Sequence, residues 1–169
     1  MATTHKAVGT LEQLIDDIVD FGGTAQTNLF LDAVQVQDAA ELALEVLQAT
    51  NELKNTNIGI ICDSDIPRVH ADKKALSRIM RHLLDNAVKF SPQGGNISLR
   101  GRMNPDTGKV RVEMQDHGTG IAQDQLEDIF EYFYQADGST TRRYSGTGIG
   151  LAIVRQFLEK HDSTIEVES

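Results

Sequence analysis

The clearest periodic pattern in the chain lies between residues 73 and 90. Its apolar positions recur at the i, i+3 and i+4 spacing of an amphipathic helix, and Asp72 stands just before them, where a carboxylate can cap a helix. The pattern therefore predicts a helix over 73–90. Its core-facing positions are Leu76, Ile79, Met80, Leu83, Leu84, Ala87 and Val88.

Two further helices are predicted before this one. Apolar residues repeat at helical spacing over 11–19, with acidic residues between them, which predicts a short amphipathic helix. The segment 29–36 has the pattern of a strand. After it, Asp38 and Glu41 form a capping-box pattern at the start of a helix over about 38–53.

Strands are predicted where apolar runs are short or alternate with polar residues. The segment 57–62 is a short buried strand by this criterion. The segments 96–103 and 109–116 alternate on either side of the turn sequence NPDTG, so we expect them to form an antiparallel hairpin.

The last third of the chain adds a helical stretch over about 123–135, a helix after Gly148 and a final strand over 163–169. Helices and strands thus alternate around an antiparallel hairpin. The predicted fold class is α+β, a two-layer sandwich of a mixed, mostly antiparallel sheet with helices on one face.

The negative net charge of the chain limits the kinds of molecule that it can bind. The chain has 169 residues and a formal net charge of −9, which disfavours wholesale binding to nucleic acid or to an anionic membrane. A polyanionic small ligand would need a locally assembled cationic site. Cys62 is the only cysteine, so no intramolecular disulfide forms, and its apolar context predicts a buried structural thiol.

No apolar stretch approaches the length that spans a membrane, and the N-terminus lacks the apolar core of a secretion signal. We therefore expect a soluble, cytoplasmic segment without direct membrane contact. A parent protein anchored elsewhere in its sequence is compatible with this expectation.

A polar stripe on the predicted helix 73–90 is the first candidate for chemistry. His82, Asn86 and Lys89 fall within about 60° of one another on the solvent side of the helix, beside its apolar face. A carboxamide oxygen can bind Mg²⁺, and a lysine one turn later can offset phosphate charge. The stripe fits a magnesium nucleotide, although an ordinary solvated helix face has the same pattern.

The sequence DHGTGI at 116–121 is the second candidate. An ionised Asp116 only accepts hydrogen bonds, so it suits the exocyclic amine of adenine and would repel the carbonyl oxygen of guanine. Gly118 and Gly120 allow a sharp turn and a close approach to a flat ligand. A plain turn after a strand is the alternative explanation.

The third candidate is GTGIGLAIV at 146–154. Its glycine spacing matches neither the phosphate-loop motif nor the dinucleotide motif. A glycine-rich turn at a helix N-terminus remains, where amide groups and the helix dipole attract phosphate. The polar segment before it suits a mobile lid over about 136–147, from which Arg142 or Arg143 would reach a terminal phosphate.

Four motifs in this order, RHLLDNAVKFSP, DHGTGI, IFEYFYQADGSTTRRYSGTGIGLAIV and TIEVES, resemble the ATP-binding catalytic domain of sensor histidine kinases. They look like the asparagine box, the first glycine box, the phenylalanine box and the second glycine box of that family. The resemblance covers about 28–169 and implies the Bergerat-type ATP-binding fold shared with gyrase, MutL and the heat-shock chaperones. Residues 1–27 look like the end of a dimerisation and phosphoacceptor helix followed by a linker.

By this resemblance Asn86 binds Mg²⁺, Lys89 contacts phosphate, Phe90 lies beside the base and Asp116 accepts the adenine amine. Arg142 is carried on the lid, and Gly146 borders the triphosphate. The resemblance also implies further nucleotide-binding positions, which are Gly118, Gly120, Ile121, Thr147, Gly148, Ile149, Gly150 and Leu151.

The chain departs from the family pattern in three places. His82 stands where the family usually has asparagine, which leaves its role open between a general base and a supporting hydrogen bond. Asp162 and Ser163 replace the usual glycine pair, and aspartate tolerates left-handed backbone, so we expect a modified turn there. The chain also stops at Ser169, before the closing strand of the family.

The resemblance implies an ATP-dependent protein histidine kinase that uses ATP and Mg²⁺. Its phosphoacceptor histidine would come from a dimerisation domain outside this chain, with a response regulator downstream. Two alternatives remain, a serine kinase of the anti-sigma-factor type and a non-catalytic, ATP-dependent docking or sensor module.

Overall fold

The computed structural model describes the chain at residues 15 and 19 and over 28–50, 53, 56–91, 94–135 and 147–169. These residues belong to two compact units. One is Leu29–Gly120, and the other is Ile121–Ser169 together with Met1–Asn28. Among the described residues, the first unit contains a three-stranded sheet, a two-stranded sheet and two long helices, and the second contains one long helix.

A three-stranded mixed sheet forms one layer of the unit Leu29–Gly120. Its strands are β2 (Thr56–Cys62), β4 (Gly95–Met103) and β5 (Val110–Gln115), in the order β2-β4-β5. β2 runs parallel to β4, and β4 runs antiparallel to β5. The predicted strand over 57–62 and the predicted hairpin are both confirmed, but β2 is half-buried to exposed rather than buried.

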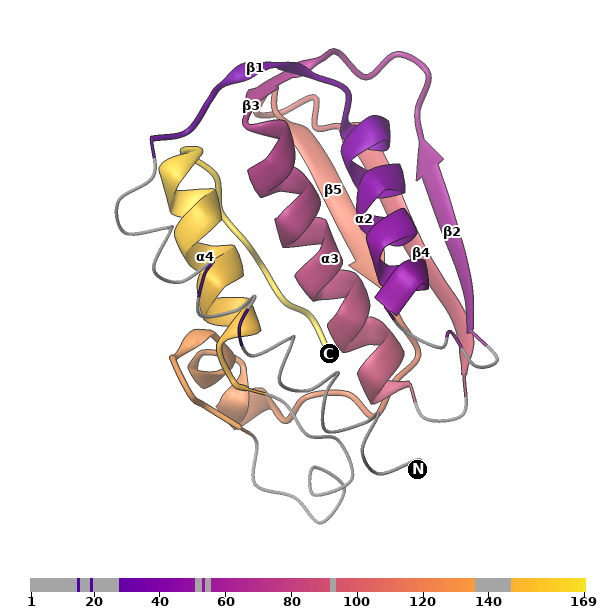
Figure 1. Cartoon of the computed structure of the whole chain (residues 1–169), viewed down its shortest axis with the longest axis vertical. Coiled ribbons are helices and arrows are strands. Elements are labelled where there is room, and N and C mark those ends of the chain that lie inside the picture. Colours follow the sequence, from indigo (N-terminus) through magenta and orange to yellow (C-terminus); the bar gives the residue numbers. More distant parts are fainter. Residues whose placement is uncertain are drawn as a thin grey trace. The chain divides into compact units, whose positions relative to one another are not determined.

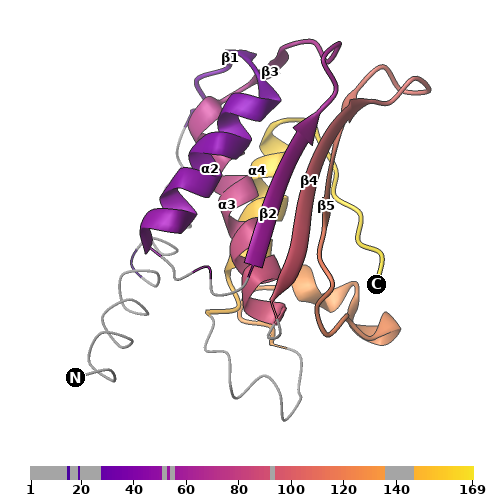
Figure 2. The ribbon, with the colours of Figure 1, turned by 90° about the vertical axis from the view of Figure 1, so that its right-hand side faces the viewer.

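Helices α2 (Val36–Thr50) and α3 (Lys73–Phe90) lie side by side on one face of this sheet (Figures 1 and 2). The predicted bounds of α3 are confirmed, and so is the cap at Asp72. One carboxylate oxygen of Asp72 accepts the backbone N–H groups of Lys74 and Ala75 at 2.9 and 3.0 Å. The predicted two-layer α+β arrangement is therefore present in this unit.

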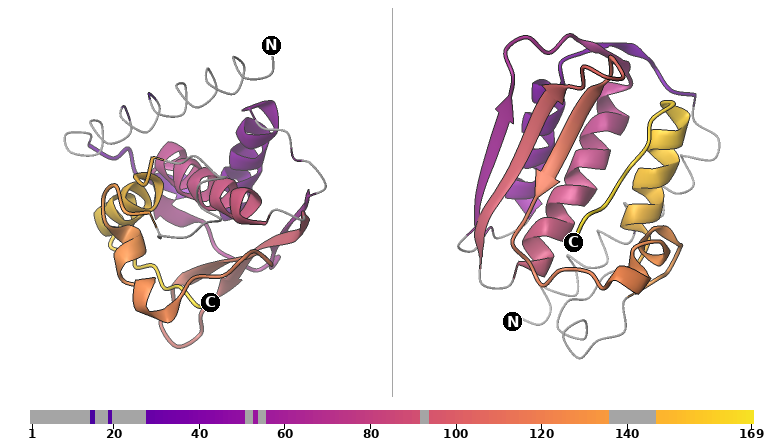
Figure 3. Two further views of the ribbon diagram at one scale, coloured as in Figure 1. Left: turned by 90° about the horizontal axis from the view of Figure 1, so that it is seen from below. Right: turned by 180° about the vertical axis from the view of Figure 1, so that it is seen from behind.

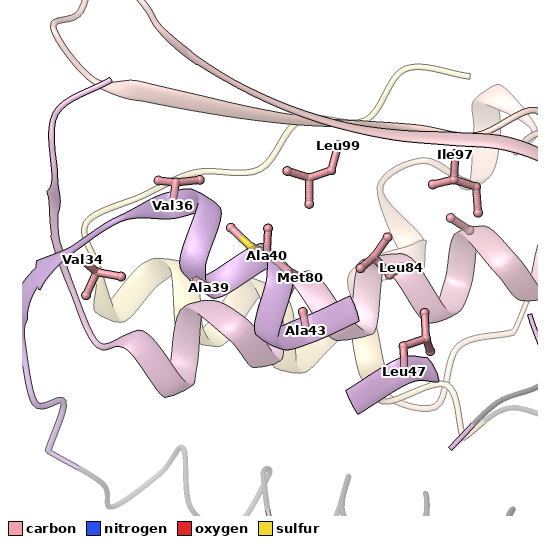
Figure 4. Close-up of a cluster of buried hydrophobic side chains, with 11 residues drawn as sticks. Val34, Val36, Ala39, Ala40, Ala43, Leu47, Met80, Leu84, Ile97 and Leu99 are labelled. Carbon is pink, nitrogen blue, oxygen red and sulfur yellow. The ribbon is translucent and has the colours of Figure 1, made fainter. Parts of the chain in front are cut away.

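The core of the unit lies between the helices and the sheet (Figure 4). α2 faces α3 mainly with small residues, which lets the two helix backbones approach closely. α3 and β4 supply larger side chains, and burying each of these contributes about 1.5–3 kcal/mol. The side chains of Ala39, Ala40, Ala43, Leu47, Met80, Leu84, Ile97 and Leu99 are at most 2% exposed.

The start of the unit differs from the sequence prediction. The strand expected over 29–36 is only β1 (Asp32–Val34), and it pairs with β3 (Val69–Ala71), which the sequence analysis did not predict. α2 begins at Val36 because that residue is 3% exposed and continues the buried stripe of the helix. Asp38 thus lies in the first turn, and the predicted capping box is wrong.

In the second unit, the helix predicted over 123–135 is wrong. Two short 3₁₀ helices stand there instead, η1 (Gln123–Gln125) and η2 (Asp128–Phe130). A continuous helix would need helical backbone at Phe133, which instead has φ 63° and donates its N–H to the carbonyl of Gly148 at 2.9 Å. This tertiary hydrogen bond replaces the helical one.

The helix predicted after Gly148 is confirmed as α4 (Gly150–Lys160). It ends in a turn where Asp162 has φ 51° and Ser163 donates its N–H to the carbonyl of Leu158 at 2.9 Å. The turn is therefore modified but intact, as predicted for an aspartate in left-handed backbone.

The strand predicted over 163–169 is not formed. Exposure still alternates along it, with half-buried Ile165 and Val167 between exposed neighbours. An alternating segment becomes a strand only through ladder hydrogen bonds, and the described residues offer this segment no such partner. The oxygen of its last side chain, Ser169 Oγ, instead accepts the N–H of Ile121 at 2.6 Å.

The predicted helix over 11–19 lies outside the described residues except for Ile15 and Val19, which are helical and exposed. Cys62 is half-buried at the end of β2, and burial raises the pKa of its thiol above the ordinary value. Within the described part of the chain, no helix is long and apolar enough to cross a membrane.

Candidate functional site

The C-terminal half of α3 holds the first group of predicted site residues. Asn86 and Lys89 are half-buried, and the ammonium group of Lys89 lies 5.2 Å from the centre of the Phe90 ring. His82 differs from the prediction of a solvent-side position, because it is only 6% exposed. The polar stripe thus runs from a buried imidazole to a half-buried lysine at the end of the helix.

The loop after β5 is tied to this end of α3. Thr119 donates its backbone N–H to the carbonyl of Phe90 at 3.2 Å. Asp116, at the start of the loop, is exposed, and its Oδ1 accepts the N–H of Gly118 at 2.8 Å. The hydrogen bond fixes the carboxylate while its second oxygen remains available to a ligand.

Gly118 lies close against the backbone at the end of α3. A Cβ at this position would lie 2.5 Å from the carbonyl oxygen of Phe90 and 2.8 Å from Asp116 Oδ1. Real Cβ atoms essentially never approach that closely, so the loop can lie against the helix end only because residue 118 has no side chain. Gly120 has φ 73°, which also favours glycine.

The structure therefore brings Phe90, Asp116 and Gly118 together, with Asn86 and Lys89 on the last turns of the same helix. This arrangement offers one fixed acceptor, one carboxamide and one cation around the end of α3. Such a set suits a ligand with an amino group at one end and negative charge at the other.

A hollow elsewhere in the same unit has the wrong charge for such a ligand. It has a volume of about 300 Å³ and is lined by Asp38, Glu41, Leu42, Glu45 and Lys73. Its carboxylates would repel a polyphosphate. Nor do the described residues bring together three His, Cys, Asp or Glu side chains that could hold a metal ion.

In the second unit, the start of α4 is built around Gly148. This residue has φ 69°, and a Cβ there would lie 2.8 Å from the carbonyl oxygen of Tyr134. Thr147 Oγ1 accepts the N–H of Ile149 at 3.2 Å, and no side chain caps the helix itself. The first amide groups of α4, at Gly150 and Leu151, therefore remain suited to an anion.

The remaining predictions fall into two groups. Ile121 is half-buried at the start of the second unit. The structure does not describe residues 136–146. These include Arg142, Gly146 and all of the predicted lid except Thr147.

One residue beside the site was not singled out from the sequence. Ser91 ends α3 directly after Phe90, is 6% exposed, and its hydroxyl has no hydrogen-bond partner among the described residues. The Ser-Pro pair at 91–92 marks the end of a helix, and this signal was available in the sequence. It gives no reason to expect a buried hydroxyl.

Comparison with known proteins places these features in a family. Residues 71–169 match the family described as histidine kinase-, DNA gyrase B- and HSP90-like ATPases. The matched range contains Asn86 on α3, Asp116 on the loop after β5 and Gly148 before α4.

Similar proteins include two sensory kinases. The adaptive-response sensory kinase SasA of a Nostoc species is 30% identical over 95% of this chain and 40% of its own length. The sensor histidine kinase WalK of Bacillus subtilis is 28% identical over 80% of this chain and 22% of its own length.

Among solved structures, full-length ShkA in complex with AMPPNP is similar, with a TM-score of 0.74 and 29% identity. The similarity covers 92% of this chain and 32% of ShkA. The chain thus spans between about a fifth and two fifths of the length of these proteins.

Proposed function

The chain belongs to the family of histidine kinase-, DNA gyrase B- and HSP90-like ATPases, and we propose that it is the ATP-binding catalytic domain of a two-component sensor histidine kinase. It transfers the γ-phosphoryl group of ATP to a histidine on a dimerisation domain outside this chain. A response regulator then takes the phosphoryl group. We place the reaction in the cytoplasm, where ATP is available.

The observation that carries the proposal is the fixed carboxylate of Asp116. Its Oδ1 accepts the N–H of Gly118, so its other oxygen accepts the exocyclic amine of adenine in our proposal. The backbone carbonyl of Phe90 lies against the same loop, and in our proposal the Phe90 ring covers one face of the base. Guanine would present a carbonyl oxygen to the carboxylate, and two acceptors repel each other.

We propose that α3 contributes to binding the phosphate end of the nucleotide, and we propose the start of α4 separately as a phosphate-binding element. Asn86 presents its carboxamide oxygen to Mg²⁺, which keeps water and phosphate oxygens as its other ligands. Lys89 offsets phosphate charge. Amide groups at Gly148, Gly150 and Leu151 donate to phosphate oxygens, and Arg142 reaches the terminal phosphate.

The transfer itself needs little acid or base assistance. A neutral imidazole on the acceptor domain is already a nucleophile, so positioning and neutralisation of phosphate charge provide most of the catalysis. His82 is 6% exposed, which gives it little access to water. We therefore assign His82 a positioning role beside Asn86, one helical turn later, rather than the role of a general base.

Phosphoryl transfer tests the proposal. ATP labelled at the γ-phosphate is incubated with the chain and a dimerisation domain supplied in trans. We expect label on the dimerisation domain that is lost in acid and kept in base, as for phosphohistidine. Asn86→Ala should lower the rate by about 100-fold or more, because the metal loses a ligand beside the triphosphate.

Two outcomes would contradict the proposal. Acid-stable label would indicate a serine kinase, and ATP binding without any transfer would indicate a docking or sensor module. Asn96→Ala is the matched control, because Asn96 is exposed at the start of β4, and it should leave the rate unchanged.

A further inference from the structure

The right-hand view of Figure 3 shows, from behind, the face of the sheet that points away from α2 and α3. The charge of this face is unusual for the protein. Residues alternate between the two faces of a strand. Since Ile97 and Leu99 of β4 are buried in the core, Arg100 and Arg102 belong to the outer face. Arg111 and Glu113 of β5 lie beside them in the register. The outer face therefore carries three arginines and one glutamate, in a chain whose net charge is −9.

Two of these arginines are held in place by the glutamate. Arg102 and Arg111 stand directly opposite each other in the register, which is unfavourable for like charges. Glu113 Oε1 lies 2.6 Å from Arg102 Nη2 and 3.0 Å from Arg111 Nε, so it bridges them. A single carboxylate carries only one of the two negative charges needed to balance this pair of arginines.

The third arginine, Arg100, lies on the side of Glu113 that is nearer to β2. Arg100 is exposed, stands opposite Glu113 in the register and makes no ion pair with any residue that the structure describes. On its other side it is paired with Ile61 of β2, which is 57% exposed. Arginine beside an exposed aliphatic side chain is typical of protein interfaces, where arginine is enriched and lysine is depleted.

We propose that Ile61, Arg100, Arg102 and Arg111 form a docking surface for an acidic protein segment. Carboxylates of the partner bind the guanidinium groups of Arg100 and Arg102, of which Arg102 is held in place by Glu113. An apolar side chain of the partner covers Ile61. Nucleic acid and anionic membranes fit less well. They are extended polyanions, and the net charge of −9 would repel them outside this small patch.

The test uses the full chain and a short fluorescein-labelled peptide rich in glutamate that carries two leucines. Fluorescence anisotropy at low salt should show binding that weakens as salt is added. Replacing both Arg100 and Arg102 by glutamine should weaken binding by about tenfold or more, since two charge-assisted contacts are lost. Circular dichroism confirms that the variant is folded.

Lys74→Gln with Lys160→Gln is the matched control. It removes the same amount of positive charge from exposed positions on α3 and α4, and it should leave the affinity within about twofold of the parent. Equal weakening by both double variants would overturn the proposal, and so would a parent chain that does not bind the peptide. Tighter binding of short duplex DNA or of phosphatidylserine vesicles than of the peptide would overturn the assignment to a protein partner.

Discussion

Gly118→Ala is expected to weaken the binding of Mg·ATP by about 100-fold or more. The added Cβ would lie 2.5 Å from the carbonyl oxygen of Phe90 and 3.1 Å from its carbonyl carbon. Both atoms belong to the backbone at the end of α3 and have little freedom to move. The loop must therefore move away from the helix, and Asp116 moves with it because its carboxylate accepts the N–H of residue 118. Calorimetric titration of Mg·ATP measures the effect.

Gly59→Ala is the control for this substitution. Gly59 lies in β2, and a Cβ there meets no atom within 4 Å. Alanine is also the better residue for a strand, since glycine loses more conformational freedom on folding. ATP affinity should stay within about twofold of the parent. Gly118→Ala with unchanged affinity would show that the loop does not shape the nucleotide site.

Gly148→Ala is expected to destabilise the fold by about 3 kcal/mol or more, the sum of backbone strain and steric overlap. Gly148 has φ 69°, and a Cβ there would lie 2.8 Å from Tyr134 O and 2.9 Å from Phe133 C. The same residue accepts the N–H of Phe133 at 2.9 Å. Its displacement would disturb the start of α4. Chemical denaturation followed by circular dichroism measures the loss.

Gly108→Ala separates the two causes. Gly108 has φ 65°, but a Cβ there meets nothing within 4 Å. This substitution introduces the strain without the overlap and should cost about 1 kcal/mol. Equal losses for the two variants would mean that the steric overlap with residues 133 and 134 adds no cost to the backbone strain.

The parts of the fold that the sequence predicted well have patterns set by local physics. α3 has an unbroken apolar stripe and a capping aspartate, and both of its bounds were correct. The hairpin β4–β5 alternates around a turn with Asp and Gly, and it was also correct. In both cases the residues that define the element are near neighbours in the chain.

The parts that were missed depend on distant partners. β1 and β3 are short strands stabilised by each other across about 35 residues of sequence, and no local pattern marks β3. The backbone at Phe133 is held by Gly148, so the aromatic-rich segment around it does not continue as a helix. The segment 163–169 has the alternation of a strand, but the described residues provide no ladder for it.

For the candidate site, the sequence motifs predicted the residues, and the structure gives a physical reason for the spacing of two of them. Asp116 and Gly118 are separated by one residue because the carboxylate accepts the N–H of Gly118. Position 118 requires glycine because any side chain there would overlap the carbonyl of Phe90, which lies 28 positions earlier in the sequence. The burial of His82 was not predicted, since its place on the helical wheel lies at the margin of the apolar face.

The most direct test of the account is a calorimetric titration of the parent chain with Mg·ATP and with Mg·GTP, repeated for Asp116→Asn. If Asp116 binds the adenine amine, ATP should bind at least about tenfold more tightly than GTP, and Asp116→Asn should lose most of that preference. Asp124→Asn, an exposed aspartate in η1, is the matched control and should keep it. Equal affinity of the parent chain for ATP and GTP would contradict the assignment of Asp116, and with it the proposed adenine site.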